Sequence, residues 1–176
     1  MADFEKALRY ALGNEGGESD IQGDLGGHTN FGITQENLDA YNAKRPNTDF
    51  PANVHDLTYQ NAESFYRGEG FWHYDNVLDQ VVADKIFDLG VNCWTHEAVL
   101  VAQRALGAMG AQLSLDGVWG PATEAAINAA DTSIFVPLFV KFAYDHYQGI
   151  VAEHPDQEKF LAGWLNRSRK LPNADQ

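Results

Sequence analysis

The sequence is poor in cysteine and in long apolar stretches. Its single cysteine, Cys93, cannot form an internal disulfide, so the fold does not depend on an oxidising compartment. No apolar run approaches the roughly 20 residues that a transmembrane helix needs, and residues 1–8 carry acids where a secretory signal would start with basic residues. We therefore expect synthesis in the cytoplasm without a signal peptide and no membrane insertion. Action outside the inner membrane would then require release or export by another system.

Positive charge is also scarce, because 12 Lys and Arg residues stand against 25 Asp and Glu residues, for a net charge of −13. This charge repels phosphate backbones and makes nucleic acid an unsuitable partner. The same charge is unfavourable for approach to the anionic polymers of many bacterial walls. The six histidines and one cysteine show no His-Glu-x-x-His or Cys-x-x-Cys spacing, so the sequence predicts no metal site and implies no organic cofactor.

A chain of 176 residues suits one compact unit, or two small lobes that share a core. Apolar residues recur at spacings of three and four, which predicts a mainly α fold. The first helix carries Phe4, Ala7 and Leu8 on one face and ends near Gly13. Cap residues and N-terminal prolines predict where the later helices start, at Thr34, Thr58, Asp79, Thr95, Pro121 and either Ser133 or Pro137, with Phe160 and Trp164 on the last helix.

The segment 16–32 interrupts this helical pattern. It holds six glycines and several acids, which predicts a loop or short hairpin, and Glu15 directly precedes it. Glycosidic cleavage needs one protonated carboxyl and usually a second group that activates water or stabilises the transition state. Glu15, at the end of an apolar helix, suits the first role, and Asp24 suits the second. The alternative is that these acids are ordinary solvated loop residues; a calcium loop is disfavoured by the spacing of Asp20 and Asp24.

The strings Glu15-Gly16-Gly17, Asp24-Leu25-Gly26-Gly27 and Thr29-Asn30-Phe31-Gly32-Ile33-Thr34 resemble the signature of glycoside hydrolase family 108. This family comprises phage and bacterial N-acetylmuramidases, including endolysin-like proteins once described as secretion activators. The similarity continues through residues 86–92 and 98–107, and residues 116–123 resemble the family's peptidoglycan-binding C-terminal half. Two departures are Glu18, where the family often has an aromatic residue, and Leu25, where it often has proline.

The resemblance implies a lysozyme-like helical fold with a glycine-rich loop or small hairpin near the active site. It implies a muramidase lobe in residues 1–92 and a peptidoglycan-binding-like lobe in 93–176 that shares one core with it. The expected protein is a monomer whose partner is bacterial peptidoglycan, and it acts in the periplasm or cell wall. The expected reaction is hydrolysis of the β-1,4 bond between N-acetylmuramic acid and N-acetylglucosamine.

Carried over by position, Glu15 is the catalytic acid, and Asp24 and Thr29 hold the attacking water as in phage-type lysozymes. The alternative for Thr29 is that it caps a turn. His28, Asn30 and Phe31 are candidates for lining the sugar cleft, and the alternative is that they only shape the loop. Trp72 is a candidate for stacking on a sugar, although aromatic residues of small helical proteins more often lie in the core.

Two other functions stay open at this stage. The chain can be a non-catalytic wall-binding or secretion-linked module that keeps the fold without turnover. It can also be a peptidase or amidase that uses Cys93 as nucleophile with His96 as base, although a buried structural cysteine fits the sequence better. The sequence leaves open whether the glycosidic cleavage inverts or retains configuration.

Overall fold

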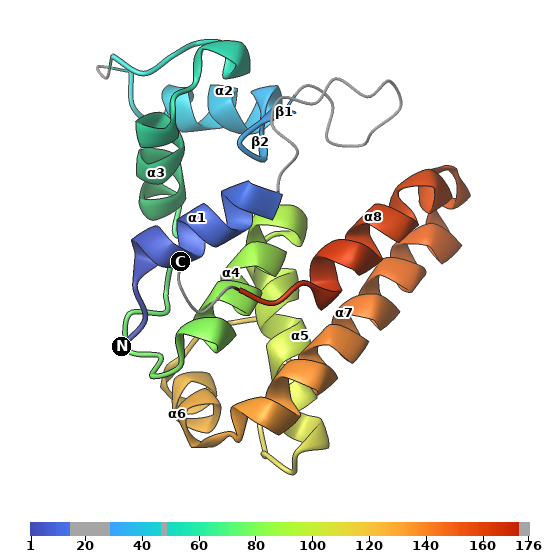
Figure 1. Cartoon of the computed structure of the whole chain (residues 1–176). Coiled ribbons are helices and arrows are strands. Elements are labelled where there is room, and N and C mark those ends of the chain that lie inside the picture. The colour runs from blue at the N-terminus through green and yellow to red at the C-terminus, as the bar shows by residue number, and fades with distance from the viewer. Residues whose placement is uncertain (15–28, 47–48, 173–176) are drawn as a thin grey trace. The chain divides into compact units, whose positions relative to one another are not determined.

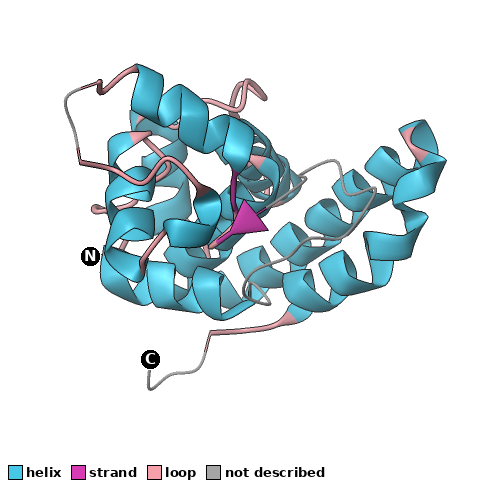
Figure 2. Cartoon of the chain, turned by 90° about the horizontal axis from the view of Figure 1, so that it is seen from above, coloured by secondary structure: helices cyan, strands magenta, loops and turns pink. Residues whose placement is uncertain are grey.

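The computed structural model describes residues 1–14, 29–46 and 49–172. Within these ranges the chain forms eight α-helices, two short 3-10 helices and one two-stranded hairpin. Figure 2 shows how far helices dominate, with the strand pair as a small magenta patch. The mainly α prediction is confirmed. None of the described helices is both long enough and apolar enough to cross a lipid bilayer.

The described elements follow the predicted order. Their bounds are α1 Phe4–Asn14, β1 Thr29–Asn30, β2 Ile33–Thr34, α2 Gln35–Ala43, η1 Val54–Asp56, α3 Tyr59–Gly68, α4 Gln80–Cys93, α5 Thr95–Ala108, α6 Pro121–Ala129, α7 Thr132–Glu153, η2 Pro155–Gln157 and α8 Glu158–Arg169. The chain divides into two compact units, one made of residues 1–11 and 73–176 and the other of residues 12–72. This geometric division differs from the expected lobes, 1–92 and 93–176, whose separate functions stay a prediction.

Several helices begin where the sequence predicts, because a side chain accepts a hydrogen bond from an otherwise unpaired backbone N–H. Thr34 accepts from the N–H of Asn37 at the start of α2. Thr58 and Asn61 form a reciprocal capping box at the start of α3, and the Asp79 carboxylate accepts two N–H groups at the start of α4. Pro121 is the first residue of α6, as expected.

The prediction that Thr95 caps α5 is wrong. Thr95 is already the first helical residue, and the N-cap position is Trp94, whose side chain makes no capping hydrogen bond. Trp94 is the one residue between α4 and α5, with φ 74° and ψ 152°. The helix therefore starts one residue earlier than a Thr95 cap would allow, and the connecting residue supplies no side-chain cap.

The larger unit is a helical assembly in which α4 packs on α5, α5 on α7, and α7 beside α8 (Figure 1). Its core consists of apolar faces of these helices and of α1. The ring of Phe4 meets Phe87 edge-on at 5.7 Å between centroids, and Phe135 packs on Phe139 at 5.7 Å. The predicted inward residues Val82, Ile86 and Leu89 and Val99, Ala102 and Leu106 are all buried.

The smaller unit holds the hairpin, α2, η1 and α3 around an aromatic cluster. The ring of Phe65 contacts those of Tyr41, Tyr66 and Phe71 at centroid distances of 5.2, 5.4 and 6.1 Å. Ile33 of the hairpin is also buried. Ile33 thus links the hairpin to the buried core of this unit.

Candidate functional site

The two carboxyl groups proposed for catalysis, Glu15 and Asp24, lie outside the described residues, and so does His28. The structure describes the segments on either side of them. On the N-terminal side, α1 ends at Asn14, one residue beyond the predicted end, so Glu15 immediately follows an amphipathic helix. On the C-terminal side, the chain enters β1 at Thr29.

Residues 29–34 form a short hairpin, which overlaps the end of the segment 16–32 where a loop or short hairpin is predicted. Thr29 pairs with Thr34 and Asn30 with Ile33 in an antiparallel register. The two turn residues, Phe31 and Gly32, have φ values of 54° and 73°, as a two-residue turn of type I′ requires. Phe31 is an unusual residue for the left-handed region, so the surrounding structure must hold this turn in place.

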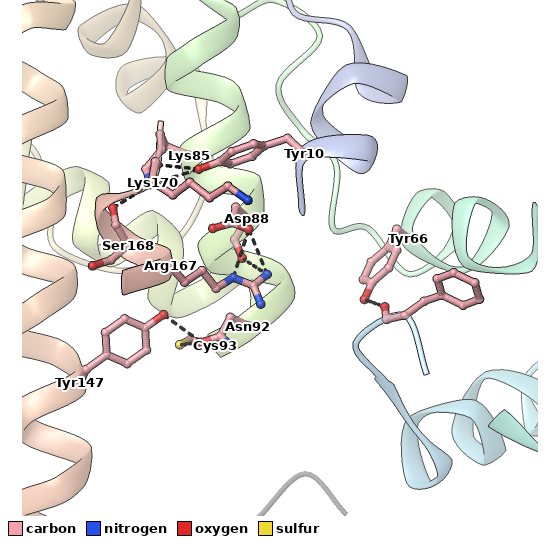
Figure 3. A network of polar contacts seen from close by, with 11 residues as sticks. Tyr10, Tyr66, Lys85, Asp88, Asn92, Cys93, Tyr147, Arg167, Ser168 and Lys170 are labelled. Atoms are coloured by element: carbon pink, nitrogen blue, oxygen red, sulfur yellow. Dashed lines mark hydrogen bonds and ion pairs between the residues drawn. The ribbon is translucent and has the colours of Figure 1, made fainter. Parts of the chain in front are cut away.

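Two side-chain hydrogen bonds provide that support. The Tyr66 hydroxyl, labelled in Figure 3, donates to the carbonyl oxygen of Phe31 at 2.7 Å. The Asn30 amide nitrogen donates to the carbonyl oxygen of Val54 at 2.9 Å, which ties the hairpin to η1. Asn30 therefore shapes the loop; contact of Asn30 or Phe31 with a sugar stays a prediction.

Thr29 is partly exposed at the first position of β1, opposite Thr34. Its backbone is fixed by the hairpin, while Thr34 takes the capping role at α2. The structure thus places Thr29 on a strand near the end of the segment 16–32. Its proposed part in holding water stays a prediction.

The aromatic residues near position 72 have different surroundings. Phe71 is buried against Tyr66, with centroids 5.1 Å apart, and Tyr74 is fully buried and meets Trp119 edge-on at 4.7 Å. Both are core residues. Trp72 is partly exposed in the segment that follows α3, so its proposed contact with substrate stays open.

A buried polar network that the sequence reading missed joins α4 to the C-terminal end of α8 (Figure 3). Lys85 is 1% exposed, and its Nζ donates to the carbonyl oxygens of Ser168 at 2.7 Å and Lys170 at 2.9 Å. The Tyr10 hydroxyl also donates to the Lys170 carbonyl, at 2.7 Å. Burial lowers the pKa of Lys85 from 10.5 to about 8. These donors satisfy carbonyls that the end of α8 leaves without helical partners.

An ion pair extends this network along α4. Arg167 donates from Nε to a carboxylate oxygen of Asp88 at 3.1 Å, and its Nη2 lies 3.0 Å from the same oxygen. Both side chains are largely buried. The sequence held one signal for this network: Asp84, Lys85 and Asp88 interrupt an otherwise apolar helix, and charges in such a place are usually paired.

The segment 116–123, which resembles a peptidoglycan-binding motif, is organised by Gln103 of α5. The buried Gln103 amide oxygen accepts the N–H groups of Asp116 and Gly117 at 3.1 and 2.9 Å. Its nitrogen donates to the Asp116 carboxylate at 2.8 Å. Gly117 has φ 65°, and a Cβ there would lie 2.5 Å from the ring of His96. Gly117 therefore has a structural role within this segment, and Gln103 of α5 has a structural role in holding it.

The surroundings of Cys93 do not support a nucleophile. Burial raises the pKa of its thiol to about 12, so the reactive thiolate is strongly disfavoured at neutral pH. The thiol donates to the Asn92 side-chain oxygen at 3.3 Å, and the same oxygen accepts from the Tyr147 hydroxyl at 2.8 Å. His96, the proposed base, pairs with Glu97 at 2.9 Å.

Comparison with known proteins finds two matching family models and similar solved structures. Residues 8–93 match the family model described as Glycosyl hydrolase 108, and residues 97–169 match a model described as Predicted Peptidoglycan domain. The solved structure of Brucella abortus SagA is similar in fold, with a TM-score of 0.69 and 24% identity over 94% of this chain and 92% of that chain. No curated protein sequence matches the chain.

Proposed function

Because this chain belongs to glycosyl hydrolase family 108 and has a mainly α, lysozyme-like fold, we propose that it is an N-acetylmuramidase. In this proposal, it hydrolyses the β-1,4 bond between N-acetylmuramic acid and N-acetylglucosamine in bacterial peptidoglycan. The observation that carries the proposal is the family match over residues 8–93, which contain the motif beginning at Glu15.

The two family models support a glycoside hydrolase with a peptidoglycan-directed role, either in hydrolysis or in binding. The particular bond and the residues that cleave it are our inference. The proposed sites of action are the cell wall and periplasm, where the substrate is located. Bacteriolytic activity of the kind that phage endolysins show is part of the same proposal, as is a monomeric state.

The proposed mechanism gives Glu15 the role of general acid, which protonates the oxygen of the leaving sugar. This role requires a carboxyl that stays protonated nearer neutral pH, as a partly buried carboxyl does because burial raises its pKa. Asp24, with Thr29, positions the attacking water. The support for Thr29 is its place on a hairpin anchored by Tyr66, since a rigid strand holds a site residue more accurately than a free loop.

The stereochemical outcome follows from one distance. A separation of about 6.5–9.5 Å between the carboxyls of Glu15 and Asp24 leaves room for water and gives inversion, whereas about 5 Å gives a retaining route. The anomer formed first, read by proton NMR on a soluble glycan fragment, distinguishes the two. The proposal of water held by Asp24 and Thr29 expects inversion, and a retained anomer would contradict it.

The direct test is clearance of purified cell walls by the wild type and Glu15→Gln. The account expects loss of at least about 100-fold in rate for Glu15→Gln, because general acid catalysis contributes about 10²–10⁴-fold. Glu36→Gln is the matched control, since it makes the same charge change at an exposed position in the first turn of α2 and should retain the wild-type rate. Equal activity of the wild type and Glu15→Gln would overturn the assigned role.

The second candidate function is a non-catalytic wall-binding module, which the match of residues 97–169 to a peptidoglycan domain favours. It predicts that the wild type co-sediments with purified peptidoglycan without clearing it. Clearance by wild type together with a loss in Glu15→Gln would exclude this candidate.

A further inference from the structure

The C-terminal helix α8 carries a large share of the positive charge of this acidic chain. Residues 159–172 include four of the 12 basic residues, Lys159, Arg167, Arg169 and Lys170, and no Asp or Glu. The rest of the chain holds eight basic residues against 25 acidic ones. Charge asymmetry of this kind is typical of chains that contact an anionic partner.

Three of these four charges lie on the outer face of α8. Helix α8 packs along α7 (Figure 1), and the ring of Trp164 stacks on that of Tyr147 with centroids 5.3 Å apart, which directs one face of α8 inward. Arg167 also pairs inward, with Asp88 at 3.0 Å. The remaining positions recur at spacings of three and four and are all exposed: Lys159, Ala162, Gly163, Asn166, Arg169 and Lys170. The one acid of α8, Glu158, is in its first turn.

The backbone that presents Arg169 and Lys170 is fixed from below. Lys85 Nζ and the Tyr10 hydroxyl both donate to the Lys170 carbonyl oxygen, at 2.9 and 2.7 Å (Figure 3). Lys85 also donates to the Ser168 carbonyl oxygen at 2.7 Å. These bonds use backbone oxygens, so the side chains of Arg169 and Lys170 stay exposed on an anchored segment. An anchored segment loses less freedom when it binds a ligand.

A glycine stands in the middle of the same face. Gly163 lies inside α8, where glycine destabilises a helix relative to alanine. A Cβ at Gly163 would meet no heavy atom of the described residues within 4 Å, apart from the backbone of its own helix. Packing within the described part of the chain therefore does not require this glycine. With Ala162 beside it, the helix backbone is open to close approach by an extended ligand.

The chemistry of this face suits a peptide that carries carboxylates. An arginine pairs with a carboxylate through two parallel N–H···O bonds, and a lysine does so as a point charge. The Asn166 side chain offers both a donor and an acceptor for a peptide backbone. Peptidoglycan contains such ligands, because the short peptides attached to its glycan strands bear free carboxylates.

We propose that the outer face of α8 binds the carboxylate-bearing peptides of peptidoglycan, with Arg169 and Lys170 pairing with carboxylates and the peptide passing over Gly163 and Asn166. This inference rests on the proposed function for the identity of the ligand. It gives the segment that matches Predicted Peptidoglycan domain, residues 97–169, a defined contact surface at its C-terminal end.

The test is co-sedimentation with purified peptidoglycan freed of attached anionic polymers, using chains that also carry Glu15→Gln so that the glycan stays intact. Arg169→Gln combined with Lys170→Gln should weaken binding about tenfold, the effect of losing about 1.4 kcal/mol. Lys6→Gln combined with Arg104→Gln is the control, because it makes the same charge change at exposed positions of the same unit and should bind like the parent. Peptidoglycan whose carboxylates have been converted to amides should bind the parent about tenfold more weakly as well.

A second pair of variants tests the middle of the face without removing a base. Gly163→Glu adds bulk and negative charge there and should weaken binding about tenfold. Its unfolding temperature should not fall, because glutamate favours a helix more than glycine does. Gly107→Glu is the control: Gly107 is an exposed glycine of α5 whose added Cβ also has open space, and this variant should bind like the parent.

Equal binding losses in the two double variants would overturn the inference, because net charge would then control binding. Unchanged binding by Gly163→Glu would overturn it too, and so would a loss that came with a lower unfolding temperature, which would mark a structural role for the glycine. Absence of binding by the parent, or binding only to walls that keep their anionic polymers, would also contradict the assignment to peptide carboxylates.

Failure of the proposed function gives a different result. Clearance assays with intact Glu15 report hydrolysis independently of the binding measurement. Clearance by wild type with unchanged binding of the Arg169 and Lys170 double variant would refute only the role of the α8 face. No clearance, with a tenfold binding loss confined to the α8 variants, would refute only the muramidase.

Discussion

Tyr66 helps to fix the hairpin through a hydrogen bond from its hydroxyl to the Phe31 carbonyl. This bond opposes the tendency of a non-glycine residue to leave the left-handed region. Thr29 lies two residues before Phe31, so an error in the turn would displace a residue proposed to hold water. The Tyr66 hydrogen bond therefore bears directly on the position proposed for Thr29.

We expect Tyr66→Phe to lower the free energy of unfolding by about 1–2 kcal/mol, because a carbonyl loses its donor. Cleavage should fall by at least about tenfold, since a shift of about 1 Å in a site can cost 100-fold. Tyr10→Phe is the control: it loses a bond of the same 2.7 Å length to the Lys170 carbonyl, but lies in the other unit. Chemical denaturation and wall clearance measure both effects. An equal fall in cleavage for the two variants would contradict the positioning role.

Asp84 gives a pH-dependent prediction. Burial raises its pKa from 3.8 to about 6, despite a hydrogen bond from Gln80 that favours the ionised form. The folded state thus binds this proton more tightly than the unfolded state, so the contribution of Asp84 to stability is fully present below about pH 4 and is lost as pH rises through about 6. Asp84→Asn should therefore be more stable than wild type by about 2–3 kcal/mol at pH 7.

Near pH 4 the two proteins should have similar stability, because Asp84 is then protonated in both states. Asparagine keeps the acceptor for Gln80, so the substitution changes little besides the charge. Urea denaturation at the two pH values measures the difference. A gain of the same size at both would show that ionisation of Asp84 is not its cause.

At the scale of elements, local chemistry explains why many boundaries could be predicted. Thr34, Thr58 and Asp79 cap helices through groups within three residues, so the sequence alone contains the whole interaction. The predicted start of α5 is one residue too late, because the N-cap position is taken by Trp94 in a positive-φ conformation that tryptophan rarely adopts. The residue types at 94 and 95 give no local signal for such a turn.

The buried charges of α4 were missed for a related reason. Lys85 and Asp88 lie within a predicted apolar face, and their partners are about 80 residues away in α8. Only the fold brings these groups together. Conversely, a turn near Gly32 was predictable, because the glycines of residues 16–32 favour a loop or short hairpin, but the strand bounds 29–34 were not.

Substitution of Gln103 tests whether its side chain stabilises the segment that contains Asp116 and Gly117. We expect Gln103→Ala to lower the free energy of unfolding by about 2–4 kcal/mol, because it leaves two N–H groups and the Asp116 carboxylate without this partner. Gln112→Ala, at an exposed position, should change it by less than about 0.5 kcal/mol. Thermal or urea unfolding compares them. Similar losses in the two variants would contradict the role of Gln103.

At the scale of the whole molecule, the family models cover residues 8–93 and 97–169, while the compact units divide at residues 11 and 72. The polar contacts of α4 with α8 explain part of this difference. Helix α4 belongs to the first family model by sequence, but Lys85 and Asp88 bond to Ser168 and Arg167, in the segment matched by the second.

The net charge of −13 predicts a dependence on salt. Raising ionic strength from about 0.01 to 0.1 M shortens the Debye length from about 30 to 10 Å, which weakens repulsion from an anionic wall. The initial clearance rate should therefore rise over this range. Walls stripped of their anionic polymers are the control and should show a smaller increase. A falling rate on intact walls would contradict the electrostatic account.

The central claim is tested most directly by mass spectrometry of the fragments that wild type and Glu15→Gln release from purified peptidoglycan, after reduction of the new sugar ends. The account predicts muropeptides that end in reduced N-acetylmuramic acid from the wild type and none from Glu15→Gln. Fragments that end in reduced N-acetylglucosamine, or free peptides with intact glycan strands, would contradict it.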